Sequence, residues 1–547
     1  MKTRVRPLLT GFLTAVLFIG CANQKIPKPP VPTPAVEMES DGRRVADQMG
    51  FLPAGAHAMK LQMAQPNWNT EDYALINENT FRRVLDNPLS TFSIDVDAAS
   101  YSNVRRFIRD GQLPPKDAVR IEELINYFSY DYAAPTGEDP FSTTIEVGQA
   151  PWNADHQLVH VGLKGESIDM VGRPASNLVF LLDVSGSMNM PDKLPLLKKA
   201  FRMLVNELGE GDRVAMVVYA GAAGLVLEST PGDRHEVIVS ALDRLQAGGS
   251  TAGAAGIQLA YRTVTENFIT GGINRVILAT DGDFNVGLSS DAELIRLVES
   301  RRDEGAFLTV LGFGTGNLKD NKMEQIADHG NGNYYYIDSE LEARKVLVSE
   351  LGGTLHTIAK DVKLQVEFNP AAVAAYRLIG YENRMLAAED FNDDRKDAGE
   401  LGAGHTVTAL YEIIPVGAET AVDVRPVDDL KYQTSRAAVA ANSEELLTLK
   451  LRYKSPESDT SQLIEHALLA PEEGTAVSGD FAFSAAVASF GMILRGSEFK
   501  GAADISQVLK LARLGKGDDA NGYRADFISL VGDYREVLER NRAASSR

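Results

Sequence analysis

Three loops of the sequence carry oxygen-bearing side chains at spacings suited to holding a hard metal ion. The set consists of Asp183, Ser185, Ser187, Thr251 and Asp281. The first three follow an apolar run as Asp-x-Ser-x-Ser, the threonine precedes an expected helix, and the last aspartate ends a second apolar run. Carboxylates and hydroxyls together make an all-oxygen set, which suits octahedral Mg²⁺ better than Zn²⁺. An open position on such an ion would attract a carboxylate from another molecule.

A parallel sheet is needed to bring those loops together, because the carboxyl ends of its strands share one edge. Residues 175–358 have the corresponding pattern. The runs at 177–184, 214–220, 275–280 and 307–313 are apolar on both faces, and amphipathic helical segments alternate with them. We therefore expect an α/β fold with a mostly parallel, Rossmann-like sheet covered by helices on both faces.

Segments of period two flank this α/β unit on both sides. Residues 141–174 and 359–470 alternate apolar and polar side chains, as Val159, Val161 and Leu163 do. Strands with one apolar face and one wet face are typical of a β-sandwich. The α/β unit is therefore expected to be inserted in, or flanked by, a β-sandwich.

The N-terminus has the pattern of an export signal. Residues 1–20 combine a basic start with an apolar stretch too short to span a bilayer, and Cys21 follows directly. This run resembles a bacterial lipobox, which implies cleavage before Cys21 and attachment of lipid to it. A plain signal peptide followed by an idle cysteine is the alternative. Because Ala22 stands where an inner-membrane retention signal has Asp, the resemblance implies, for a Gram-negative organism, the outer membrane, on its periplasmic or its surface side.

A tether is expected between this anchor and the folded part. The lipidated cysteine and the tether together take residues 21–88, and residues 25–34 hold five prolines, which favours an extended, semi-rigid spacer. An N-terminal helical segment is expected at 89–140. A helical C-terminal domain is expected at 471–547.

The five oxygen ligands and their strand context resemble the von Willebrand factor type A (VWA) family, whose metal-ion-dependent adhesion site has the same residue types. The resemblance implies that Ser185, Ser187 and Thr251 coordinate the metal, directly or through water. It implies that Asp183 and Asp281 hold the ion directly or through water, and that a protein partner supplies an Asp or Glu as the last ligand. Mg²⁺ is the expected ion, with Mn²⁺ and Ca²⁺ as alternatives. The whole layout also resembles bacterial VWA lipoproteins with a C-terminal domain of unknown function.

Composition excludes several other classes of protein. Lys+Arg 55 against Asp+Glu 75 gives a net charge of −20, which disfavours nucleic-acid binding. A single cysteine rules out an intramolecular disulfide and a Cys-rich metal site. His156 and His160 are expected on the wet face of a strand, about 13 Å apart at 3.3 Å per residue, too far to share an ion. Asp97 is expected to cap the helix at 98–109.

Three functions remain open. We expect a binding module rather than an enzyme, held at the membrane and capturing a protein partner through Mg²⁺. A metal-stabilised envelope scaffold is one alternative. A metal-assisted hydrolase, in which the ion activates water, is the other. It is disfavoured because nothing in the sequence ties a general base, such as His329 or His356, to the metal ligands.

Overall fold

A computed structural model describes most of the chain beyond residue 70. The described residues are 71–168, 172–249, 253–282, 291–316, 318–420, 422, 424, 444–472 and 474–545, and all belong to one compact unit. Cys21, the proline-rich stretch and Thr251 lie outside them. Within the described ranges, no helix is both long and apolar enough to cross a membrane.

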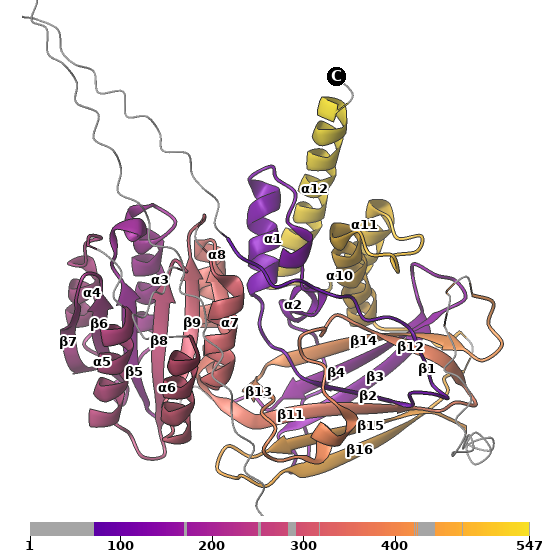
Figure 1. Cartoon of the computed structure of the whole chain (residues 1–547), viewed down its shortest axis with the longest axis horizontal. Coiled ribbons are helices and arrows are strands. Elements are labelled where there is room, and N and C mark those ends of the chain that lie inside the picture. Colours follow the sequence, from indigo (N-terminus) through magenta and orange to yellow (C-terminus); the bar gives the residue numbers. More distant parts are fainter. Residues whose placement is uncertain are drawn as a thin grey trace, which may run out of the picture. The chain divides into compact units, whose positions relative to one another are not determined.

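The α/β part is built on a six-stranded sheet in the order β10-β9-β8-β5-β6-β7 (Figure 1). Its strands are β5 (Ser176–Asp183), β6 (Arg213–Tyr219), β7 (Ala223–Pro231), β8 (Ile273–Thr280), β9 (Phe307–Phe313) and β10 (Tyr334–Ile337). All neighbours pair in parallel except β7, which runs antiparallel at the edge. The mostly parallel sheet expected from the sequence is confirmed.

Helices cover both faces of this sheet because strand β5 has apolar side chains on both faces. Phe180 and Leu182 pack into one apolar core, whereas Val179 and Leu181 pack into another on the opposite face. All eight residues of β5 are therefore buried. The covering helices are α3 (Leu194–Asn206), α4 (His235–Asp243), α5 (Gly253–Glu266), α6 (Asp291–Asp303), α7 (Asp320–His329) and α8 (Glu340–Arg344).

Two antiparallel sheets form a sandwich beside the α/β part. One has the order β1-β12-β14-β4-β3, and the other has the order β13-β11-β15-β16 with β2 paired to β11. The strands are β1 (Arg82–Arg83), β2 (Leu89–Ser93), β3 (Phe141–Gln149), β4 (Gln157–Gly165), β11 (Thr357–Phe368), β12 (Val373–Ile379), β13 (Gly399–Gly402), β14 (Thr406–Pro415), β15 (Glu445–Lys454) and β16 (Gln462–Leu469). The chain leaves the sandwich after β4 and returns at β11, so the α/β part is an insertion.

Helices from both ends of the described chain share one apolar core. These are α1 (Ala99–Arg109), α2 (Ile121–Asn126), α10 (Gly479–Arg495), α11 (Ile505–Leu514) and α12 (Tyr523–Ser545). Figure 1 shows the purple N-terminal pair beside the yellow C-terminal helices. Leu158 of β4 and Leu410 of β14 belong to the same core, so these helices cover the outer face of that sheet.

The expectation of a wet face on β4 is therefore wrong. His156 is 1% exposed and His160 is 0% exposed. The Nε2 atom of His160 lies 2.6 Å from the hydroxyl of Tyr132, and its Nδ1 atom lies 3.1 Å from the hydroxyl of Ser484 on α10. The alternation of polar and apolar residues correctly predicted a strand. Its polar face is buried, however, because the helices cover it and supply hydrogen-bond partners.

Two smaller expectations also differ from the structure. Residues 71–88, assigned to the tether, pack on the folded part: β1 pairs with β12, and Val84 is 1% exposed in the sandwich core. Asp97 does not cap α1, whose N-cap residue is Ala98 without a side-chain cap. Instead its Oδ1 atom accepts a hydrogen bond from the backbone N–H of Tyr334 at 2.9 Å.

Candidate metal centre

Asp183 stands at the carboxyl end of β5 and is fully buried. Its Oδ1 atom accepts a hydrogen bond of 2.8 Å from the backbone N–H of Ser185, which fixes the turn after the strand. Its Oδ2 atom accepts one of 3.3 Å from the hydroxyl of Thr280, the last residue of β8. The carboxylate is thus held where two neighbouring parallel strands end.

The two serines of the Asp-x-Ser-x-Ser loop lie against each other. Their hydroxyl oxygens are 2.9 Å apart. Two ligands about 2.1 Å from an octahedral Mg²⁺ and adjacent to one another are about 3.0 Å apart, so this spacing is compatible with shared coordination. Ser185 is buried whereas Ser187 is exposed. Ser185 is the N-cap residue of the short 3₁₀ helix Gly186–Asn189, but its side chain makes no capping hydrogen bond.

Asp281 follows β8 directly and is 1% exposed. The register Leu182↔Ala279 between β5 and β8 brings Asp281 to the same edge of the sheet as Asp183. Its Oδ2 atom accepts a hydrogen bond of 2.9 Å from Nζ of Lys193, an ion pair with little exposure on either side. The edge therefore carries two carboxylates, two hydroxyls and one ammonium group.

Lys193 is held in place by its surroundings. It precedes α3, and its aliphatic stem passes over Gly314 after β9. Gly314 has a φ of +74°, and a Cβ atom there would overlap the lysine stem. Nothing in the local sequence pointed to Lys193, because its partner Asp281 comes 88 positions later in the chain.

Thr251 lies outside the described residues, but the chain leading to it is tied to this edge. Gly248 donates a backbone hydrogen bond to the carbonyl of Val184 at 2.8 Å, and Gly249 accepts one from Gly186 at 3.1 Å. Gly249 has a φ of +83°, and its position lies close to the backbone of Gly221. Glycine is favoured there because both the left-handed backbone and the close approach disfavour a side chain.

The electrostatics of the edge favour a bound cation. Burial, and then the nearby charge of Asp281, raise the pKa of Asp183 to about 6, although hydrogen bonds from Ser185 act in the opposite direction. Two buried carboxylates at one strand edge are costly to ionise together, and a cation offsets that cost. The donors are all oxygen, so the residues present fit Mg²⁺. Asp183, Ser185, Ser187 and Asp281 would hold it.

The histidines considered as general bases are engaged elsewhere. His329 pairs with Glu299 at 3.0 Å, and Nδ1 of His356 lies 3.3 Å from the carbonyl of Thr357. In the part of the chain that the structure describes, no hydrogen bond links either ring to Ser185. Among the described residues, neither histidine is hydrogen-bonded to the strand edge that carries Asp183 and Asp281.

Three family models match consecutive parts of the chain. A model described as von Willebrand factor matches residues 67–160, the von Willebrand factor type A domain matches 177–350, and the C-terminal region of "Uncharacterized protein YfbK" matches 353–537. The protein of that name from Escherichia coli (strain K12) is 43% identical over 505 residues, which covers 91% of this chain and 87% of the relative. The chain belongs to the YfbK family. Neither the description of the matched domain nor the name of this relative denotes an enzyme.

Solved structures resemble the chain with lower identity. A von Willebrand factor type A protein from Catenulispora acidiphila is 16% identical, covers 70% of this chain and 89% of its own, and gives a TM-score of 0.39. An aerotolerance-related membrane protein from Bacteroides fragilis is 24% identical, covers 32% of this chain and 98% of its own, and gives a TM-score of 0.29. The VWA fold is therefore assigned to this YfbK family member from its own sheet topology and from the match to the von Willebrand factor type A family.

Proposed function

We propose that this YfbK family member is a membrane-anchored VWA protein that binds a protein partner through a Mg²⁺-dependent adhesion site. The observation that carries the proposal is the set of four oxygen-bearing side chains, Asp183, Ser185, Ser187 and Asp281, at the ends of β5 and β8. Mn²⁺ and Ca²⁺ are alternative ions for the same donors. The partner contributes an Asp or Glu carboxylate, and Thr251 completes the set on the side of the protein.

Exposure and charge favour this use of the site. Asp183, Ser185 and Asp281 are buried, whereas Ser187 is exposed, so the set is open to solvent on the side of Ser187. When bound, the ion supplies a positive charge that the neutral hydroxyls do not cancel. The residues of the chain fix that charge in place and leave it accessible. An approaching carboxylate can then satisfy it, which a fully closed site would prevent.

The anchor is the second part of the proposal. Cys21 follows an apolar segment in a lipobox-like run, and lipid attached there would hold the protein at the outer membrane. Fractionation of cells producing the full chain tests this. The wild type should sediment with the outer membrane, whereas Cys21→Ala should not. Equal recovery of both in the membrane fraction contradicts lipid anchoring through Cys21.

A binding experiment tests the adhesion site. Full-length wild type, Asp183→Ala and Asp243→Ala would be immobilised and exposed to solubilised envelope, with Mg²⁺ or with EDTA. Asp243 is the matched control because its carboxylate lies in the same domain in an exposed ion pair with Arg202. A partner retained by the wild type and by Asp243→Ala with Mg²⁺, but not by Asp183→Ala and not with EDTA, supports the proposal. Retention that depends on neither Mg²⁺ nor Asp183 contradicts it.

The two alternatives predict different results. For a metal-stabilised scaffold, EDTA and Asp183→Ala would lower the melting temperature, and no Mg²⁺-dependent partner would be retained. For a metal-assisted hydrolase, the Mg²⁺-loaded chain would turn over generic esters or phosphoesters, and Asp183→Ala would abolish that turnover. Circular dichroism melting and a colorimetric ester assay distinguish these outcomes from adhesion.

A further inference from the structure

Residues 71–73 are the first described part of the chain, and they pack on the loop that follows β9 of the VWA sheet. The Oε1 atom of Glu71 accepts a hydrogen bond of 2.9 Å from the backbone N–H of Gly316. The backbone N–H of Asp72 donates one of 3.1 Å to the carbonyl of Leu318. We call residues 71–73 the strap. It holds a loop at the same edge of the sheet as the proposed metal ligands.

The carboxylate of Glu71 is buried, with 2% of its side chain exposed. Its Oε2 atom accepts hydrogen bonds of 3.0 Å from Nη2 of Arg106 on α1 and of 3.0 Å from the hydroxyl of Tyr73. Burial raises the pKa of Glu71, but Arg106 and the N–H of Gly316 outweigh burial and hold that pKa below its usual value. Charge-assisted hydrogen bonds are stronger than neutral ones. The ionised carboxylate therefore fixes Gly316 to α1.

The same loop determines where the side chain of Lys193 can lie. The carbonyl of Gly314 accepts a hydrogen bond of 2.9 Å from the hydroxyl of Tyr336, which is 1% exposed. A Cβ atom at Gly314 would overlap three carbon atoms of the Lys193 stem, so the stem and the loop are in direct contact. Lys193 is itself 6% exposed. Its ammonium group cannot leave Asp281 unless its stem moves against this loop.

The ammonium group of Lys193 competes with Mg²⁺ for one carboxylate of the strand-edge site, which consists of Asp183, Ser185, Ser187 and Asp281. Nζ of Lys193 lies 2.9 Å from Oδ2 of Asp281. Two cations on one buried carboxylate repel each other. Lys193 must therefore move aside when the site takes up the ion. Since the strap holds the loop that the lysine stem touches, it opposes this exchange.

We propose that Glu71 is a positioning residue of the strand-edge site, which holds Lys193 on Asp281 through the loop after β9 and so lowers the affinity of the site for Mg²⁺. The proposal rests on the Mg²⁺ site of the proposed function but not on its protein partner. Coupling between two sites is reciprocal. Occupancy of the strand-edge site by Mg²⁺ in turn loosens the strap.

Mg²⁺ titration of the full chain tests the positioning role. Wild type, Glu71→Ala, Lys193→Met and the double variant would be freed of metal and titrated with MgCl₂ in a calorimeter. Asp183→Ala provides the baseline for binding elsewhere on the chain. We expect Mg²⁺ to bind Glu71→Ala about fivefold more tightly than wild type, at the lower end of typical couplings between sites. The double variant should bind Mg²⁺ no more tightly than Lys193→Met, because Glu71 acts through the lysine.

Glu78→Ala is the matched control. Glu78 lies in the same N-terminal segment and its side chain is 20% exposed, but its carboxylate pairs with Arg495 of α10 at 3.7 Å. Its replacement should leave the affinity for Mg²⁺ unchanged. Glu71→Gln replaces Glu71→Ala if the latter does not fold, because it keeps the volume of the side chain and removes the charge that faces Arg106.

Hydrogen exchange measures the strap itself. The reporters are the backbone N–H groups of Asp72 and Gly316, followed by mass spectrometry of the peptides that contain them. In metal-free protein, both should exchange faster in Glu71→Ala than in wild type. Mg²⁺ should speed their exchange in wild type but not in Asp183→Ala, because the ion acts from the strand-edge site.

Three results would overturn the proposal. If folded Glu71→Ala binds Mg²⁺ no more tightly than wild type, the strap does not act on the site, and the proposed function is unaffected. If the double variant binds Mg²⁺ more tightly than Lys193→Met, Glu71 acts by a route other than the lysine. If no variant shows Mg²⁺ binding beyond the Asp183→Ala baseline, both this proposal and the Mg²⁺ site of the proposed function are wrong.

Discussion

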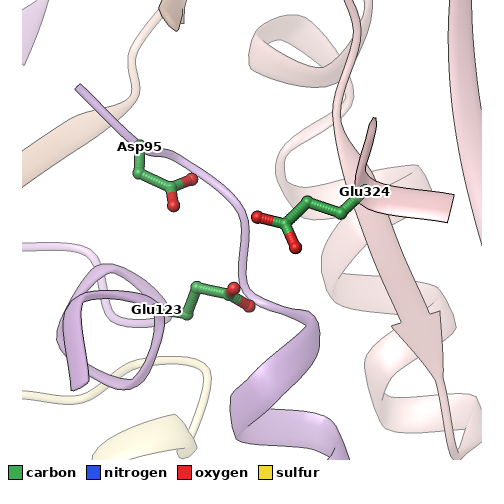
Figure 2. Close-up of side chains that lie close together, drawn as sticks. All are labelled: Asp95, Glu123 and Glu324. Atoms are coloured by element: carbon green, nitrogen blue, oxygen red, sulfur yellow. The ribbon is translucent and has the colours of Figure 1, made fainter. Parts of the chain in front are cut away.

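Carboxylates gather in opposite settings at the strand edge of the VWA sheet and at the junction, where α2, α7 and the segment between β2 and α1 bring Asp95, Glu123 and Glu324 together (Figure 2). At the edge, Asp183 and Asp281 lie next to a loop whose Ser187 is exposed, and the ammonium group of Lys193 pairs with Asp281 alone. At the junction, Asp95 and Glu123 are buried; Asp95 pairs with Arg384 from a distant part of the chain, and Glu123 pairs with Arg120 at the start of its own helix. An open acidic edge can offer a cation to a partner. A closed acidic cluster can use positive charge only to hold its own segments together.

The largest expected effect concerns the junction. Arg120→Met should lower the free energy of unfolding by about 3–5 kcal/mol, because it leaves Glu123, Asp320 and Glu324 buried without that partner. The control is Arg395→Met, whose side chain is 90% exposed and pairs with Asp393, and which should change stability by less than about 0.5 kcal/mol. Urea unfolding of both variants measures the difference. Equal, small effects would remove the contrast between the two regions.

A second prediction concerns pH at the helix-covered face of β4. Burial lowers the pKa of His160 to about 4 from 6.5. The unfolded chain therefore binds a proton before the folded chain does, and stability is lost as pH falls from about 6.5 to about 4. By linkage the contribution of His160 reaches about 3 kcal/mol at the acid end. His160→Gln should reduce this acid sensitivity, whereas exposed His466→Gln should not, as denaturant melts at a series of pH values would show. Identical acid profiles for wild type and His160→Gln contradict the assignment.

The smallest effect concerns the strand edge itself. Lys193→Met removes the ammonium group that pairs with Asp281, so Mg²⁺ no longer competes with it for that carboxylate. We expect Mg²⁺ to bind about tenfold more tightly, or ~1.4 kcal/mol. The control is Lys199→Met on α3, since Lys199 is 54% exposed and pairs with Glu340. Isothermal titration of both variants with MgCl₂ provides the measurement. Weaker Mg²⁺ binding by Lys193→Met would mean that the lysine supports the metal rather than competing with it.

The VWA sheet was predictable because its signals are local. Strands that are apolar on both faces and helices with an apolar stripe of period 3.6 can be recognised as buried elements from a short stretch of sequence. Strand β5 ends at Asp183, as the pattern indicates. The rule that parallel strands end at one edge then brought Asp183 and Asp281 together without any coordinates. The placement of Thr251 and the lipidation of Cys21 remain predictions, since both lie outside the described residues.

The sandwich was predicted less completely, because alternation of polar and apolar residues along a strand does not indicate whether another element covers its polar face. Nothing within residues 157–165 shows that α10, more than 300 positions later, packs on that strand. His160 is therefore buried against Ser484 rather than wet. The same limit explains Asp97, whose partner is the backbone of Tyr334 rather than the adjacent helix end.

By itself the sequence determined the α/β fold, the position of Asp183 and Asp281 at one strand edge, and the classes that a charge of −20 and one cysteine exclude. These follow from short-range periodicity and from residue chemistry. Only the tertiary structure decided that the two ends of the folded chain share a helical core, that Lys193 reaches Asp281, and that Asp95, Glu123 and Glu324 meet. Those contacts join residues far apart in the chain, and their energies come from burial and charge pairing that no local window of sequence contains.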